Sequence, residues 1–98
     1  MNIKTAVEGA VVTVSVSGRV DTTTSPVLEQ ELKGRFDNCE ELILDFAEVE
    51  YISSAGLRVL LMAHKTMSRK KGMTLKNVGP EIMEIFDVTG FSDILAIE

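Results

Sequence analysis

Hydrophobic and polar positions alternate in the first part of the chain, and they predict two strands. These strands cover residues 2–7 and 10–17, and Glu8-Gly9 between them is suited to a turn. In the second stretch, VVTVSVSG, valines alternate with hydroxyl residues. We therefore expect its valine face to meet helices and its hydroxyl face to meet a more polar environment.

Three later stretches have the spacing of helices. The first begins near Pro26, which suits a first helical turn, and ends near residue 38; the second covers 54–71 and stops at Gly72; the third covers 80–90. The first of them has apolar residues at four-residue intervals, namely Leu28, Leu32 and Phe36.

Between and after these helices, residues 41–46, 73–78 and 94–97 are predicted to be strands. The run at 41–46 is apolar without clear alternation, which predicts a central strand that is buried on both faces. Strands separated by helices require parallel crossovers. The sequence thus predicts an α/β fold with a mixed sheet flanked by helices, in the order ββαβαβαβ, and a chain of 98 residues fits a single domain over 1–98.

The amino-acid composition and net charge indicate which kinds of partner the protein can bind. Hydrophobic residues make up 45% and charged residues 26% of the chain, which is typical of a folded domain, and the formal net charge is -5. A negative chain is a poor match for nucleic acid, whose phosphates are bound by clustered cations. The single cysteine, Cys39, fits a reducing compartment, and no apolar run is long enough for a membrane span. We expect a cytoplasmic protein that binds neither nucleic acid nor membrane.

Between the third strand and the second helix lies a polar hinge, Ser53-Ser54-Ala55-Gly56. A serine just before an apolar helical run is a typical N-cap, so Ser54 or its neighbour Ser53 is expected at the exposed start of the helix. A helix N-terminus also favours a phosphate, because its free N–H groups and its dipole attract anions. Ser54 is therefore a candidate phosphoacceptor, and the alternative is that it only caps the helix.

The segment YISSAGLRVLL, together with GRVD at 18–21, resembles the STAS domain of bacterial anti-sigma factor antagonists, and the resemblance covers almost the whole chain. In that family the hinge usually reads Asp-Ser-Ser/Ala/Thr-Gly-Leu, and a partner that is both anti-sigma factor and serine kinase phosphorylates the serine after the Asp. The resemblance gives Ser54 the phosphoacceptor position and Gly56-Leu57 the Gly-Leu positions. Ser53 departs from the pattern, since it replaces the usual Asp.

Asp21 matches the loop Asp of the family. If the strands are parallel, it should lie at the same sheet edge as Ser54, with Thr22 and Thr23 beside it; the alternative for Asp21 is an Asx turn or a helix cap. The remaining residues of the predicted phosphorylation-site neighbourhood are Ser53, Ala55 and Gly56. On the second helix, an outward face is predicted to hold Arg58, Met62, Lys65 and Arg69, and we expect Arg58 and an exposed Met62 to bind the partner.

The resemblance implies a non-catalytic switch that binds the anti-sigma factor when Ser54 is unphosphorylated and so frees the sigma factor. Its partners would be an anti-sigma factor with serine kinase activity and a serine phosphatase. The alternative is a constitutive STAS scaffold in a transport or sensory complex. A hydrolase is a distant third, because Ile52 stands where a nucleophile elbow requires glycine. Nothing in the sequence predicts a metal site, a cofactor or a phosphate-binding glycine loop.

Overall fold

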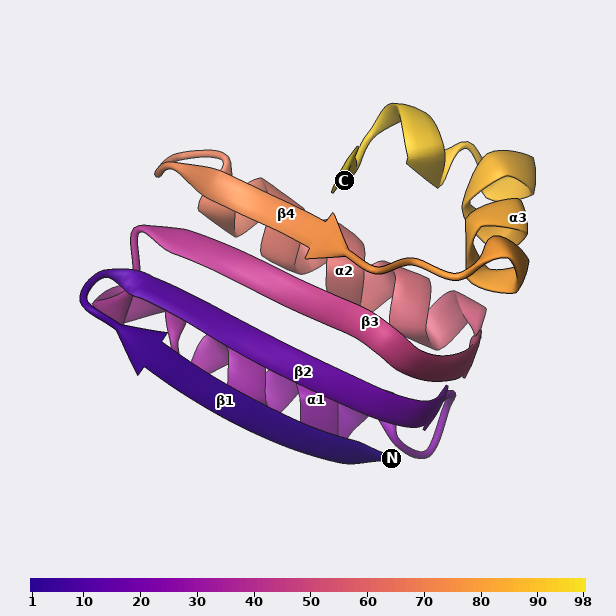
Figure 1. Cartoon of the computed structure of the whole chain (residues 1–98), viewed down its shortest axis with the longest axis horizontal. Helices are drawn as coiled ribbons and strands as arrows, with labels where there is room; N and C mark the ends of the chain where they lie inside the picture. Colours follow the sequence, from indigo (N-terminus) through magenta and orange to yellow (C-terminus); the bar gives the residue numbers. More distant parts are fainter.

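Five strands form one sheet in the order of the sequence, β1-β2-β3-β4-β5, in the computed structural model, which describes residues 1–98 (Figure 1). Strand β1 is antiparallel to β2, and all the other neighbours are parallel. The strands are β1 Asn2–Glu8, β2 Val11–Val20, β3 Glu41–Ile52, β4 Gly72–Lys76 and β5 Ala96–Ile97; the α-helices are α1 Ser25–Lys33, α2 Ser54–Met67 and α3 Pro80–Thr89; 3-10 turns cover Phe36–Asn38 and Phe91–Asp93. The predicted α/β fold, its mixed sheet and the order of its elements are confirmed.

The crossovers place α1 and α2 on the same face of the sheet (Figure 1). A crossover between parallel strands is right-handed, and here each one advances in the same direction across the sheet. Helices α1 and α2, which form the first two crossovers, must then lie on one side of the sheet. The opposite face of β1, β2 and β3 has no helix over it (Figure 1).

This one-sided cover corrects the prediction for the third strand. Leu42, Leu44 and Phe46 of β3 are buried against the helices, whereas Ile43 and Asp45 between them are only half-buried. The strand thus alternates, and it is not buried on both faces. The same alternation holds in β2, where the predicted valine face, made of Val12, Val14 and Val16, is buried.

Several element boundaries also differ from the prediction. Strand β2 continues to Val20 instead of ending at residue 17, β4 ends at Lys76 instead of residue 78, and β5 begins at Ala96 instead of residue 94. Strand β3 continues past residue 46 to Ile52, because two register shifts against β2 let polar residues extend the strand without regular alternation. Helix α1 ends at Lys33, and Phe36 is buried from a separate 3-10 turn. Helix α2 ends at Met67 rather than near Lys71.

Candidate functional site

The end of β2 and the start of α2 lie side by side. Val20 pairs with Ile52 in the parallel register, and the N–H of Ser53 donates to the carbonyl of Val20 at 2.8 Å. Strands β2 and β3 both end at the carboxyl edge of the sheet. The loop that begins with Asp21 therefore faces the first turn of α2. The structure therefore brings together the Asp21 loop and the Ser53-Ser54 hinge, which are more than thirty positions apart in the sequence.

The two hinge serines have different roles. Ser53 is the N-cap: its backbone is extended (φ -95°, ψ 176°), and its Oγ accepts a hydrogen bond from the N–H of Gly56 at 3.4 Å. Ser54 is the first helical residue, its side chain is exposed, and its hydroxyl makes no hydrogen bond within the protein. The cap is thus Ser53, and the hydroxyl of Ser54 is free.

Gly56 allows the helix to begin this close to the sheet. A Cβ atom at this position would lie 2.6 Å from Cγ1 of Ile52 and 2.9 Å from Cγ1 of Val20, which is shorter than a van der Waals contact permits. The two side chains belong to β3 and β2, so the absent Cβ fixes the distance between α2 and both strands. Gly56 consequently holds Ser54 at the sheet edge by packing.

Asp21 organises the loop that faces Ser54. One carboxylate oxygen accepts from the backbone N–H groups of Thr23 at 3.0 Å and Thr24 at 3.1 Å. The bond from the Thr24 N–H is the main reason why the pKa of Asp21 lies below its usual range; the Thr24 hydroxyl, the Thr23 N–H and the charge of Arg19 act in the same direction against partial desolvation. The Asx turn that was an alternative for Asp21 is therefore present, and Thr22 and Thr23 extend from it as exposed residues.

Arg19 and Tyr51 lie on the uncovered face next to this loop. The Arg19 guanidinium lies 4.4 Å from the centre of the Tyr51 ring and 3.9 Å from the Asp21 carboxylate. No motif or periodic pattern in the sequence marks Tyr51 as a site residue. The pairing follows from the register shift that places Tyr51 opposite Arg19, which no local pattern reveals.

A groove of about 390 Å³ runs between the first turns of α1 and α2. Arg58 is exposed at this groove, whereas Met62 is half-buried and packs against the core, so the expectation that Met62 is fully solvent-facing is wrong. The groove is lined by Thr22, Ser25, Pro26, Glu29, Ala55, Arg58, Val59 and Met62. It brings the predicted partner-binding residues Arg58 and Met62 next to Thr22 and Ala55 of the predicted phosphorylation-site neighbourhood.

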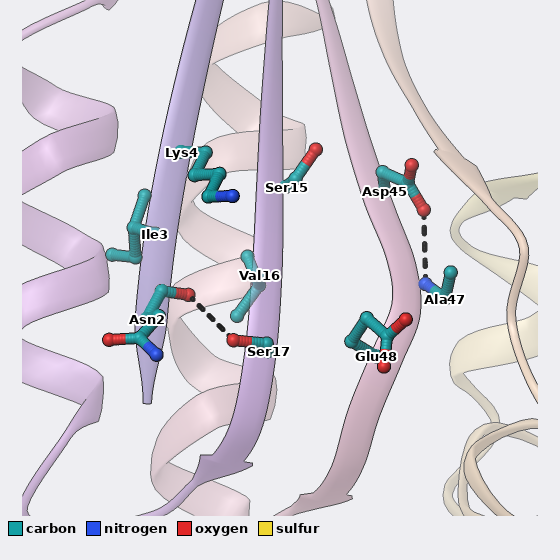
Figure 2. A pocket seen from close by; sticks show the side chains of 9 residues that line it. All are labelled: Asn2, Ile3, Lys4, Ser15, Val16, Ser17, Asp45, Ala47 and Glu48. Carbon is teal, nitrogen blue, oxygen red and sulfur yellow. Dashed lines mark hydrogen bonds between the residues drawn. The ribbon is translucent and has the colours of Figure 1, made fainter.

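A second hollow lies on the uncovered face of β1, β2 and β3 (Figure 2). Its polar side chains include Lys4, Ser15, Asp45 and Glu48, and the Asp45 carboxylate accepts from the N–H of Ala47 at 3.0 Å. This hollow was not predicted as a site, although the alternating hydroxyl residues of β2 indicate a polar sheet face here. The residues are of mixed charge, and no two of them form an ion pair.

No helix of the structure is both long enough and apolar enough to cross a membrane.

The chain belongs to the STAS domain family, whose sequence profile matches residues 2–98. Over 84 residues it is 34% identical to BtrV of Bordetella bronchiseptica, an alignment that covers 84% of this chain and 72% of BtrV. It is also 29% identical over 85 residues to the anti-sigma-B factor antagonist of Bacillus subtilis, covering 86% of this chain and 78% of that protein. The sequence relatives thus include a named anti-sigma factor antagonist.

Solved structures agree with this assignment. An anti-sigma factor antagonist from Mycobacterium paratuberculosis superposes with a TM-score of 0.89 and 27% identity, over 98% of this chain and 83% of the other. SpoIIAA of Bacillus in its phosphorylated form superposes with a TM-score of 0.76 over 99% of this chain and 91% of the other, and at 15% identity this likeness concerns the fold. The fold is therefore one that anti-sigma factor antagonists have.

Proposed function

We propose that this protein is an anti-sigma factor antagonist that is switched by phosphorylation of Ser54. Unphosphorylated, it binds an anti-sigma factor and thereby frees the sigma factor; phosphorylated, it does not bind. The observation that carries the proposal is the exposed, unbonded hydroxyl of Ser54 at the first position of α2, next to a serine that already caps the helix. Modification of Ser54 would leave the cap intact.

In this proposal, the phosphate changes the charge at the start of α2 and leaves the fold unchanged. A phosphate adds a charge of about -1.5 to -2 at neutral pH, and a helix N-terminus tolerates such a group because its N–H groups and dipole favour anions. The domain would remain folded. A partner surface packed against the first turn of α2, however, would have to accommodate a bulky dianion, which opposes binding by steric contact and by repulsion of acidic groups.

The partners in this proposal are an anti-sigma factor with serine kinase activity and a serine phosphatase that restores the binding form. The protein itself is a binding module without catalysis, and it acts in the cytoplasm together with the transcription machinery. The support is the membership of the STAS family and the function in the names of the relatives. Arg58 and Met62 at the groove beside Ser54 are the proposed contact residues.

The proposal is tested by recovering the kinase partner and mapping the phosphate. The wild-type domain, Ser54→Ala and Ser54→Asp are used as baits in extract of the native organism, and the retained kinase is then incubated with wild-type protein and ATP. We expect wild type and Ser54→Ala to retain the partner, Ser54→Asp to lose it, and phosphopeptides to carry the label on Ser54. A label on Ser53 or Thr23 contradicts the assignment, and equal retention by all three baits favours a constitutive scaffold.

A further inference from the structure

Arg58 stands one helical turn after Ser54 on the same side of α2. Side chains at positions i and i+4 of a helix are neighbours, with Cβ atoms about 5–6 Å apart. An anion that precedes a cation by four residues is also the more favourable order, because it agrees with the helix dipole. Both side chains are exposed in the structure.

The acidic groups around Arg58 already have other partners. Four ion pairs are present in the protein, and Arg58 is in none of them. Glu29, which lies across the groove on α1, pairs with Lys33 at 2.9 Å. Asp21, in the loop beside α2, is held by its own turn and lies 3.9 Å from Arg19. The guanidinium of Arg58 is therefore available to a new anion.

We propose that Arg58 is the intramolecular partner of a phosphate on Ser54. This inference rests on the proposed function, since it assumes a phosphoserine at that position. The guanidinium presents N–H donors in a planar fork that matches two phosphate oxygens. Phosphorylation then has two consequences: it adds a dianion to the partner-binding surface, and it withdraws from that surface the cation that was free to contact the partner.

The test measures the ionisation of the phosphate itself. Phosphoserine is installed at position 54 by genetic encoding, and the second pKa of the phosphate is read from the phosphorus NMR shift as the pH is varied. A nearby guanidinium favours the dianion and lowers this pKa, so its removal must raise it. We expect Arg58→Gln to raise the phosphate pKa by about 0.3 units, the size of an exposed i,i+4 ion pair, and about 1 M salt to abolish the difference.

Two further variants complete the design. Lys65→Gln removes an exposed cation from the same helix two turns farther along and is expected to leave the phosphate pKa unchanged, whereas Arg58→Lys is expected to keep most of the wild-type value. The helix dipole is common to all variants, so it cancels in the comparison. Equal phosphate pKa values in Arg58→Gln, Lys65→Gln and wild type would overturn the inference.

Failure of this inference and failure of the proposed function are distinguishable. The phosphate is placed without a kinase, so the titration reports on Arg58 whether or not Ser54 is modified in the cell. Conversely, suppose that a kinase labels Ser54 but the phosphate pKa is the same in Arg58→Gln and wild type. The proposed switch at Ser54 would then stand, and Arg58 would have no part in it.

Discussion

Ser53 and Ser54 are adjacent at the start of α2, but they have different structural roles. Ser53 has the extended backbone of an N-cap and accepts a bond from Gly56, whereas Ser54 is already helical and its hydroxyl is free. The sequence places a capping serine here but cannot tell which of the two it is. The distinction depends on the backbone angles of one residue, and both serines satisfy the same preference for capping.

Alanine substitutions separate these roles. Ser53→Ala removes the cap and is expected to lower the free energy of unfolding by about 0.5–2 kcal/mol. Ser54→Ala changes an exposed side chain without partners and should stay within about 0.5 kcal/mol of wild type. Urea denaturation of both variants is the measurement, and a larger loss in Ser54→Ala than in Ser53→Ala would reverse the assignment of the cap.

Gly56 is expected to resist replacement even by alanine. The helix would gain up to about 1 kcal/mol in intrinsic propensity, but the new Cβ would lie 2.6 Å from Ile52 and 2.9 Å from Val20. Overpacking of this kind costs about 1–3 kcal/mol, so we expect a net loss of stability in Gly56→Ala. Gly34→Ala is the matched control, because its nearest atoms would be at 3.5 Å and its φ is -68°. A gain of stability in both variants would contradict the packing argument.

At the scale of an element, α2 combines a buried face, the proposed switch residue Ser54 and an outward face. Leu57, Leu60 and Ala63 are buried, while Arg58 and Lys65 are exposed. Met62 is half-buried and packs against the core, so a charge at that position would disturb folding as well as binding. Substitution of Arg58 therefore tests the proposed partner-binding face without disturbing the core.

Charge reversal along α2 locates that face. We expect Arg58→Glu to weaken binding of the anti-sigma partner by about 1–3 kcal/mol, as for a residue near the centre of an interface, with little change in the free energy of unfolding. Lys65→Glu is the same change in charge two turns farther along and should bind like wild type. Titration calorimetry measures both. Unchanged affinity in Arg58→Glu would move the interface to the loop around Asp21.

Elements were predicted well where periodicity is regular and poorly where it is interrupted. The predicted third helix is confirmed, because Gly79-Pro80 and Gly90 mark its ends. The second half of β3 was missed because its register shifts break the alternation, and the premature end of α1 was missed because Phe36 fits the helical stripe although a separate turn carries it. Such interruptions are set by tertiary packing, which local patterns do not contain.

For the whole molecule, the order of strands explains both the uncovered sheet face and the position of the candidate site. Parallel strands end at a common edge, so the proximity of the Asp21 loop and Ser54 could be predicted from the topology. The one-sided cover by helices could not, because it requires the spatial order of the strands as well as their direction. The groove between α1 and α2 depends on how two separate helices pack, and the sequence alone gave no indication of it.

Three carboxylates link the stability of the whole fold to pH. Hydrogen bonds from Thr24 to Asp21, from Thr5 and Arg35 to Glu31, and from Asn77 and Ala47 to Asp45 lower the pKa of each group. A pKa that is lower in the folded than in the unfolded chain stabilises the fold above the unfolded value, about 4, and this contribution is lost as the pH falls through the folded value.

We therefore expect the free energy of unfolding, measured by urea denaturation, to decrease as the pH is lowered from about 5 to about 3. Glu31→Gln should reduce this decrease, because it removes one of the three carboxylates whose pKa the fold lowers. Glu84→Gln, at an exposed position without a hydrogen bond or an ion pair, should leave the decrease unchanged. If wild type, Glu31→Gln and Glu84→Gln all lose the same stability on acidification, Glu31 does not contribute to the pH dependence of unfolding.

The most direct test of the switch is the affinity of the anti-sigma partner for the domain with serine and with phosphoserine at position 54. Both forms are titrated calorimetrically against the same purified partner, after circular dichroism has shown that both are folded. We predict that the phosphate weakens binding by at least about tenfold, which corresponds to about 1.4 kcal/mol, while the helical signal is unchanged. Equal affinity of the two folded forms would contradict the proposal that Ser54 is the switch.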